Sequence, residues 1–252
     1  MTHTIDLSGQ HALVTGASGG IGRVLASRLA GAGAHVFVHY LSNHAGAAET
    51  ADAIERSGGR ATPVRANLSD PQRIRTLFEE TVGPRLDILV HNAAIGSFKP
   101  LHQVRANQWD LTVNVNARAM LLACQAALPA LEACRGKVVA ISSLGSRRVI
   151  PKYGAIGVSK AALEAVVRYL GIELAPRGIR VNAISAGLVE TESVRLHPDY
   201  ATLSALAKER TPVGRLVIAD DIADALLFLC SPMAATIVGQ TLVLDGGASL
   251  TS

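Results

Sequence analysis

Residues 11–22 read HALVTGASGGIG, and this stretch decides the fold. The apolar segment 11–15 predicts a short buried strand, and a helical pattern follows as far as Leu29. Between them lies a turn with glycine at positions 16, 19, 20 and 22. Glycines here let the backbone bend tightly and approach a pyrophosphate, which the free N–H groups at the helix start stabilise. The stretch predicts a dinucleotide-binding turn.

The rest of the chain alternates between strand and helix patterns. Further strands are expected at 34–39, in a segment ending at Ala66, and at 87–92, 136–142, 179–184 and 240–244. Helices are expected between strands, notably at 70–81, 109–131, 153–174 and 220–229. Apolar strands joined by crossover helices indicate a seven-stranded parallel sheet covered on both faces. We therefore expect one doubly wound (Rossmann-type) α/β domain over residues 1–252, with its ligand crevice beyond the carboxyl ends of the strands.

Composition excludes several classes of function. Hydrophobic residues make up 49% and charged residues 17% of 252 residues, which gives enough apolar material for a large core and excludes a disordered chain. No apolar run is long enough to span a bilayer and the first residues do not resemble a signal region, so we expect a cytoplasmic protein with no membrane partner. The net charge of +4 comes without a long Lys/Arg run, so no nucleic-acid partner is expected. The three cysteines have unrelated spacings and predict neither disulfides nor a metal site.

The end of the second strand bears on the choice of cofactor. An acidic residue there would bond both ribose hydroxyls and repel a 2′-phosphate. Residues 39–44 read HYLSNH and contain no acid. This favours NADPH, with Ser42, Asn43 and His44 able to donate hydrogen bonds to the phosphate. Because no Arg or Lys stands in this stretch, NADH remains possible.

A series of motifs in order along the whole chain is similar to that of the short-chain dehydrogenases/reductases. The series comprises Gly16-x3-Gly20-x-Gly22, His91-Asn92-Ala93-Ala94, Asn116, Ser143, Tyr153, Lys160, Ala186-Gly187 with Thr191, and Asp245-Gly246-Gly247. The resemblance implies a set of cofactor-binding residues: Gly16, Ser18, Gly20, Ile21, Gly22, Tyr40, Ser42, Asn43, Asn67, Leu68, Asn92, Ala93, Lys160, Gly187 and Thr191. It also implies a homotetramer or homodimer.

The same resemblance suggests catalytic roles. Lys160 would hold the nicotinamide ribose and favour a phenolate on Tyr153. Asn116 would steady the backbone or a water beside Lys160, and Thr191 would bond the nicotinamide carboxamide. Ser143 has two open interpretations, a hydrogen bond to substrate or a cap at the end of its strand.

The spacing of the catalytic pair departs from the usual Tyr-x3-Lys pattern. Four residues before Lys160 stands Ile156, and the nearest upstream tyrosine is Tyr153. Both spacings keep the two side chains on one helix face, but the longer one moves the phenol roughly 4.5 Å along the helix. In ketone reduction the hydride and the proton go to adjacent atoms. In reduction of an α,β-unsaturated thioester the hydride goes to Cβ while charge develops on an oxygen three bonds away. The longer spacing therefore suits an enoyl substrate.

The neighbouring segments agree with this interpretation. Residues 142–148, SSLGSRR, and 157–165, GVSKAALEA, resemble the NADPH-dependent enoyl-acyl carrier protein reductases of the Bacillus-type (type III) branch, which also use a Tyr-x6-Lys spacing. The resemblance implies an NADPH-dependent enoyl-thioester reductase of fatty acid biosynthesis, acting on a small-molecule or carrier-protein-bound substrate.

The substrate side of the site is less defined. Residues 190–215 are expected to form a substrate lid. Five basic residues near it are candidates to receive an acidic carrier protein: Arg147, Arg148, Arg195, Lys208 and Arg210. Two alternatives stay open. The scaffold can serve a ketone, an imine or another activated alkene, or, given Ile156, it can bind cofactor with little turnover.

Overall fold

The computed structural model describes residues 5–251, and its centre is one parallel sheet in the order β3-β2-β1-β4-β5-β6-β7. Every neighbouring pair is parallel, as a doubly wound fold requires. The strands are β1 (His11–Val14), β2 (His35–Tyr40), β3 (Arg60–Arg65), β4 (Ile88–His91), β5 (Lys137–Ser143), β6 (Arg180–Ala186) and β7 (Thr241–Leu244). The predicted seven-stranded parallel sheet is confirmed.

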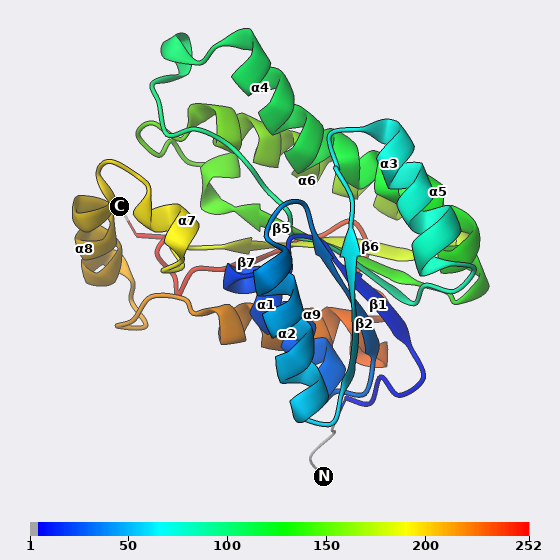
Figure 1. Cartoon of the computed structure of the whole chain (residues 1–252). Helices are drawn as coiled ribbons and strands as arrows, with labels where there is room; N and C mark the ends of the chain where they lie inside the picture. Colours follow the sequence, from blue (N-terminus) through cyan, green and yellow to red (C-terminus); the bar gives the residue numbers. More distant parts are fainter. Residues whose placement is uncertain (1–4, 252) are drawn as a thin grey trace.

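Helices cover both faces of this sheet (Figure 1). One face carries α1 (Gly20–Gly31), α2 (His44–Arg56) and α9 (Ala219–Cys230). The other carries α3 (Pro71–Thr76), α5 (Ala119–Ala133) and α6 (Gly154–Leu174), with α4 (Ala106–Val113) packed beside α6. Two short helices, α7 (Glu192–Arg195) and α8 (Tyr200–Arg210), lie near the carboxyl end of β6.

The core has two apolar layers because side chains alternate along each strand. In β1, Leu13 packs toward α3, α5 and α6, whereas Ala12 and Val14 pack toward α1, α2 and α9. All three side chains are fully buried. The short apolar strand at the start of the chain is therefore buried on both faces, as its sequence predicts.

Two predicted helices differ from the structure in their regularity. The helix expected at 109–131 begins at Ala106 and contains a π-helical segment, Asn114–Arg118, between α4 and α5. The helix expected at 70–81 becomes π-helical over Leu77–Val82 after α3. π-Helical segments often occur at functional sites, and the first of these carries Asn116. Apolar periodicity does not separate the two kinds of helix, so the sequence predicts one continuous element.

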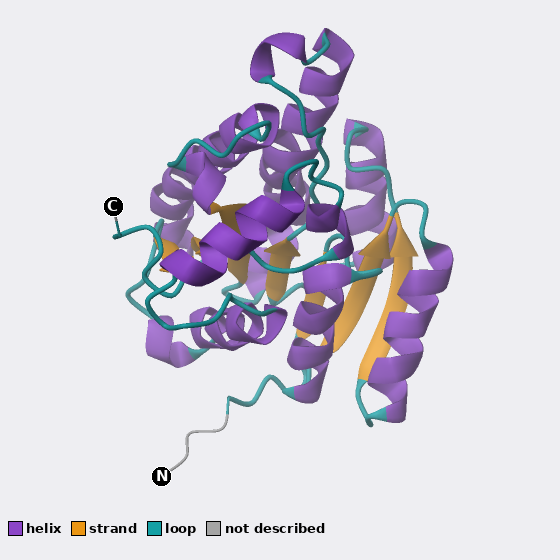
Figure 2. Ribbon diagram, turned by 90° about the vertical axis from the view of Figure 1, so that its left-hand side faces the viewer, coloured by secondary structure: helices purple, strands orange, loops and turns teal. Residues whose placement is uncertain are grey.

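All strands point to the same edge, where the loops after β1, β4, β5 and β6 meet (Figure 2). Many of the candidate cofactor and catalytic residues lie in these loops or at the helix starts that follow them. Tyr40, Ser42, Asn43, Asn67 and Leu68 lie at or after the ends of β2 and β3, Asn116 lies in the π-helical segment, and Lys160 lies within α6. Within residues 5–251 no helix combines the length and the apolarity needed to cross a membrane.

Candidate active site

The turn between β1 and α1 forms one wall of a cavity of about 1040 Å³. Gly16 and Gly20 have φ of 65° and 53°, in the region that favours glycine. A Cβ on Gly22 would lie 2.2 Å from the carbonyl oxygen of Gly16, so this position admits glycine alone. Five predicted cofactor residues line the cavity: Ser18, Gly20, Ile21, Asn43 and Thr191. Free N–H groups at the start of α1 suit a pyrophosphate here, so the residues present fit a dinucleotide.

Two predicted residues after β4 hold this turn in place. The Thr15 hydroxyl accepts hydrogen bonds from the backbone N–H groups of Asn92 (2.9 Å) and Ala93 (3.0 Å). The Asn92 side-chain amide donates to the carbonyls of Thr15 (2.9 Å) and Gly16 (3.1 Å). Asn92 therefore acts on the turn through its side-chain amide.

His39, near the end of β2, supports the same turn from the other side. Its Nδ1 accepts from the Gly16 N–H at 3.2 Å, and its Nε2 lies 3.1 Å from the carbonyl oxygen of Ala66. Burial lowers the pKa of His39 to about 4, so the ring is neutral at physiological pH. The neutral form, with the proton on Nε2, satisfies both contacts.

The residues predicted for the adenosine end take several roles. Leu68 is 5% exposed within the core, which leaves only its backbone for a ligand. Asn67 accepts hydrogen bonds from the backbone and hydroxyl of Ser69, and Asn43 caps α2 by accepting from Gly46. The Tyr40 ring packs against His44, with ring centroids 5.5 Å apart.

Arg65 is a basic residue at this end that the sequence prediction missed. Its Nε donates to the carbonyl oxygen of Leu41 at 3.1 Å, beside the exposed Ser42. The β2–β3 register places Arg65 opposite Tyr40. Arg65 is 25 positions away from Tyr40 in the sequence. Only the pairing of β2 with β3 would have shown that the two residues lie side by side.

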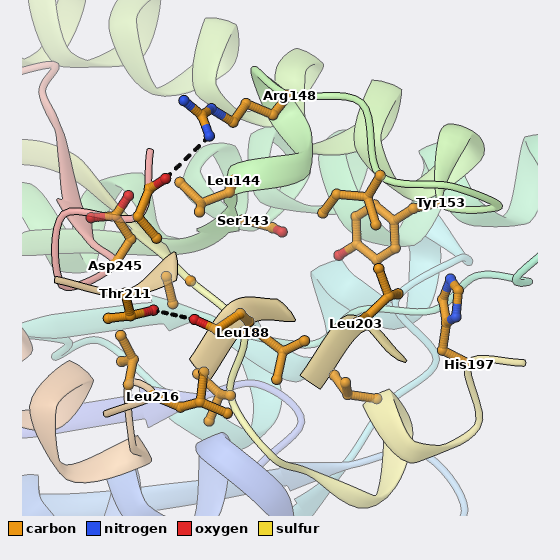
Figure 3. Close-up of a pocket in the computed structure, with 18 of the residues that line it drawn as sticks. Ser143, Leu144, Arg148, Tyr153, Leu188, His197, Leu203, Thr211, Leu216 and Asp245 are labelled. Atoms are coloured by element: carbon orange, nitrogen blue, oxygen red, sulfur yellow. Dashed lines mark hydrogen bonds between the residues drawn. The ribbon is translucent and has the colours of Figure 1, made fainter. Parts of the chain in front are cut away.

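A second cavity, of about 390 Å³, contains the catalytic candidates Ser143 and Tyr153 (Figure 3). Ser143 is the last residue of β5, and Tyr153 directly precedes α6. Both hydroxyls point into the cavity. Burial raises the pKa of Tyr153, and the Ser143 hydroxyl opposes this effect. The phenol is therefore protonated at neutral pH and able to donate a hydrogen bond.

Ile156, at the usual tyrosine position, has a packing role. It is 7% exposed, and a Cβ on Gly96 would lie 2.2 Å from its Cγ1. Tyr153 lines the catalytic cavity one helical turn earlier. The structure therefore brings the phenol of the longer spacing to the cavity.

Lys160 is buried between α6 and β5. It is 4% exposed, and its Nζ donates to the carbonyl oxygen of Ile141 at 2.6 Å. Burial lowers the pKa of Lys160 to about 8, and the charge of Glu164 opposes that shift. An ammonium group has three donors, so the contact with Ile141 is compatible with a further bond to a ribose hydroxyl.

Asn116 holds the backbone after β4. Its Oδ1 accepts from the Ile95 N–H at 2.8 Å, and its Nδ2 donates to the Ile95 carbonyl and the Ser159 hydroxyl, both at 2.9 Å. Of the two predicted roles, these contacts match steadying of the backbone. Ser143 likewise acts as a cap, since its hydroxyl accepts from the Gly145 N–H at 3.2 Å, and it faces the cavity as well.

The segment predicted as a lid forms one wall of the catalytic cavity. Its lining side chains come largely from α7 and α8 and the turns beside them: Val194, His197, Tyr200, Leu203, Leu206, Ala207, Arg210 and Thr211. The wall extends beyond 190–215 at both ends, to Leu188 and Val217. His197 joins this wall to the loop before Tyr153 through a 2.9 Å contact between Nε2 and the Pro151 carbonyl oxygen.

The five predicted basic residues have different surroundings in the fold. Arg147 pairs with Glu164 and Lys208 with Glu190, each at 3.1 Å. Arg148 donates to the carbonyls of Ala248 and Ser249. The sequence does not show which acceptor a basic side chain meets in the folded chain. Here three of the five basic side chains contact acceptors within the protein.

Comparisons with known proteins match the fold and the motifs. A family model described as Enoyl-(Acyl carrier protein) reductase matches residues 16–249. The 1-cyclohexenylcarbonyl-CoA reductase of Streptomyces collinus is 37% identical over 245 residues, covering 96% of this chain and 87% of that protein. The gluconate 5-dehydrogenase of Burkholderia cenocepacia J2315, solved with NADP and tartrate, superposes with a TM-score of 0.91 at 31% identity, covering 99% of this chain and 98% of that one. The angucycline C-6 ketoreductase LanV, with bound NADP, gives a TM-score of 0.85 at 35% identity and covers 97% of both chains.

The fold, the glycine-rich turn and these matches define an NAD(P)-dependent oxidoreductase. The chain belongs to the short-chain dehydrogenase/reductase superfamily, in the family whose model is described as Enoyl-(Acyl carrier protein) reductase.

Proposed function

We propose that this protein reduces the conjugated double bond of an enoyl thioester with NADPH. The observation that carries the proposal is the position of the Tyr153 phenol. Tyr153 lines the catalytic cavity, whereas the position of the usual tyrosine is occupied by Ile156, packed beside Gly96. An acid one turn away from the usual position suits an oxygen three bonds from the carbon that receives hydride.

The chain's own residues would act as follows. A bound nicotinamide supplies the hydride, which goes to Cβ of the substrate. The Tyr153 O–H donates to the thioester oxygen and stabilises the negative charge that develops there, before Cα takes a proton from solvent water. Lys160 holds a ribose hydroxyl and its charge favours phenolate character on the tyrosine. Asn116 and Asn92 act through the backbone that they hold.

The side chains that line the cavity suit an apolar acyl group. Much of its wall is aliphatic, from Leu144, Leu188, Leu203, Leu206 and Leu216, and Phe98 adds an aromatic ring. Polar hydroxyls meet at the Ser143–Tyr153 end, where a thioester oxygen would lie. The Streptomyces relative is named for a substrate of this kind, a cyclic alkene conjugated to a CoA thioester. We infer that residues 190–215 act as the lid over this acyl group.

A ketone substrate is the second candidate, and it also has an observation in its favour. Ser143 and Tyr153 place two hydroxyls at the same end of the cavity, which suits a ketone oxygen. The related LanV is a ketoreductase.

NADPH oxidation with matched thioesters tests the proposal. Crotonyl-CoA and 1-cyclohexenylcarbonyl-CoA serve as enoyl substrates, with acetoacetyl-CoA as the keto control of similar size. We expect turnover with an enoyl thioester and little with the keto compound. Turnover with acetoacetyl-CoA alone would assign the ketone candidate. Turnover with none, alongside measurable NADPH binding, would favour a cofactor-binding protein.

Arg65 is expected to select NADPH over NADH. Its guanidinium lies at the turn after β2, where a 2′-phosphate would sit in this fold. Because a charge-assisted hydrogen bond is worth about 1.5 kcal/mol or more, Arg65→Gln should raise the Kd for NADPH about tenfold. Fluorescence titration should show an unchanged Kd for NADH. Arg60→Gln, at the other end of β3, is the matched control. An equal change in Kd for both cofactors would show that Arg65 does not bind the 2′-phosphate.

We further propose that the protein works as a homo-oligomer. Two large side chains on α6, Tyr169 and Ile172, are each 71% exposed, which suits contact with a second copy. Light scattering of the purified protein gives the number of subunits, and a monomer at working concentration would contradict this expectation.

A further inference from the structure

Glu164 is a buried carboxylate with three hydrogen-bond donors around it. It is 3% exposed on α6, one turn after Lys160. Its Oε1 accepts from the hydroxyls of Ser142 (2.7 Å) and Ser146 (2.6 Å), and its Oε2 accepts from Arg147 Nε (3.1 Å). A buried charge costs free energy unless donors surround it. The three partners explain how the carboxylate stays buried.

The partners of Glu164 flank the catalytic serine. Ser143 lies between Ser142 and the segment Leu144–Ser146, so Glu164 holds the chain on both sides of it. The same segment packs on the catalytic ring: a Cβ on Gly145 would lie 2.5 Å from Cε1 of Tyr153. A displacement of this segment would therefore move Ser143 and allow the Tyr153 ring to move.

Glu164 also acts on Lys160 through its charge. The two residues are four positions apart on one helix face. The carboxylate raises the pKa of Lys160, against burial, which lowers that pKa to about 8. Two other titratable or charged groups face the pair: His91 from β4 acts on Lys160, and Arg147 pairs with Glu164.

We propose that Glu164 is a positioning residue that fixes Ser143 and Tyr153 through the 142–147 segment. Its carboxylate, one helical turn from Lys160, also favours the ammonium form of that residue. This inference rests on the proposed function for the roles of those three residues. It assigns a task to a carboxylate that itself does not line the catalytic cavity.

The charge effect is tested by the pH dependence of NADPH binding, which needs no acyl substrate. Glu164→Gln keeps the shape and an acceptor oxygen but removes the charge. Loss of the carboxylate lowers the pKa of Lys160 further. As the pH rises, the variant should therefore lose NADPH affinity at a lower pH than the wild type does. We expect a shift of about one pH unit, which makes the Kd at pH 8 about fivefold weaker. Glu132→Gln, which removes an exposed pair with Arg177, is the control.

The positioning effect is tested separately in the loop. The double variant Ser142→Ala and Ser146→Ala leaves the Glu164 charge in place and removes two of its donors. Its kcat should fall roughly tenfold with an unchanged KM for NADPH and an unchanged pH profile for binding. Thermal unfolding of all variants distinguishes a loss of positioning from a general loss of stability.

Two results would overturn the inference. One is a wild-type pH profile for NADPH binding in Glu164→Gln. The other is a wild-type kcat in the double serine variant. This variant keeps the Glu164 carboxylate, so it still tests the inference if Glu164→Gln does not fold. A wild-type protein without enoyl reduction would instead count against the proposed function, and the binding profiles would still decide the charge effect.

Discussion

Tyr153→Phe is expected to lower kcat for enoyl reduction by roughly 10²–10⁴-fold, the usual contribution of a positioned acid. The change removes one oxygen and keeps the ring that packs beside Gly145 and stacks with Phe98 at 6.2 Å. The fold and the cofactor turn should therefore be unaffected, and the Kd for NADPH should change by less than about twofold. Stopped-flow measurement of single-turnover NADPH oxidation checks the chemical step directly.

Tyr200→Phe is the matched control for that experiment. Tyr200 lines the same cavity from the start of α8. If Tyr153 is the acid, the loss in the Tyr200 variant should be small by comparison. Equal losses in both variants, or half of the wild-type kcat in Tyr153→Phe, would contradict the assignment.

Lys160→Met is expected to have the second-largest effect. Methionine fills a similar buried volume but removes the ammonium group that bonds the Ile141 carbonyl and is proposed to hold the ribose. Loss of a charge-assisted hydrogen bond should raise the Kd for NADPH about tenfold or more. Because Lys160 is also proposed to favour phenolate character on Tyr153, kcat/KM should fall by roughly 10²–10³-fold.

Lys137→Met provides the control for lysine removal. Lys137 begins β5, at the end of the strand opposite to Ser143. Isothermal titration should show wild-type NADPH binding for this variant. If Lys160→Met also bound NADPH like the wild type, the proposed contact with the ribose would be wrong.

Much of the fold follows from local sequence patterns. The inner strands are buried on both faces, so they are continuous apolar segments, such as residues 88–90 of β4, and stand out from the polar turns around them. The edge strand β3 (Arg60–Arg65) is half exposed, so the sequence predicts here only a segment that ends at Ala66, without a defined start. The π-helical segment around Asn116 was not predictable, because contacts with Ile95 and Ser159 stabilise it from elsewhere in the chain.

The site shows the same division between local and long-range information. The spacing places Tyr153 and Lys160 on one helix face, but the same is true of Ile156, and only the tertiary structure shows which side chain meets the cavity. The sequence did not indicate that Arg147 pairs with Glu164, because the two residues lie 17 positions apart. Arg65 was missed for a similar reason, since strand pairing brings it to the turn after β2.

The position of hydride transfer distinguishes enoyl reduction from ketone reduction. The wild-type enzyme is given NADPH deuterated at C4 of the nicotinamide, with 1-cyclohexenylcarbonyl-CoA and acetoacetyl-CoA in competition, and the products are examined by NMR and mass spectrometry. We expect deuterium at Cβ of a saturated acyl thioester, and loss of that product in Tyr153→Phe. Deuterium at the carbinol carbon of a hydroxyacyl thioester, with the enoyl substrate unchanged, would contradict the proposed enoyl reduction.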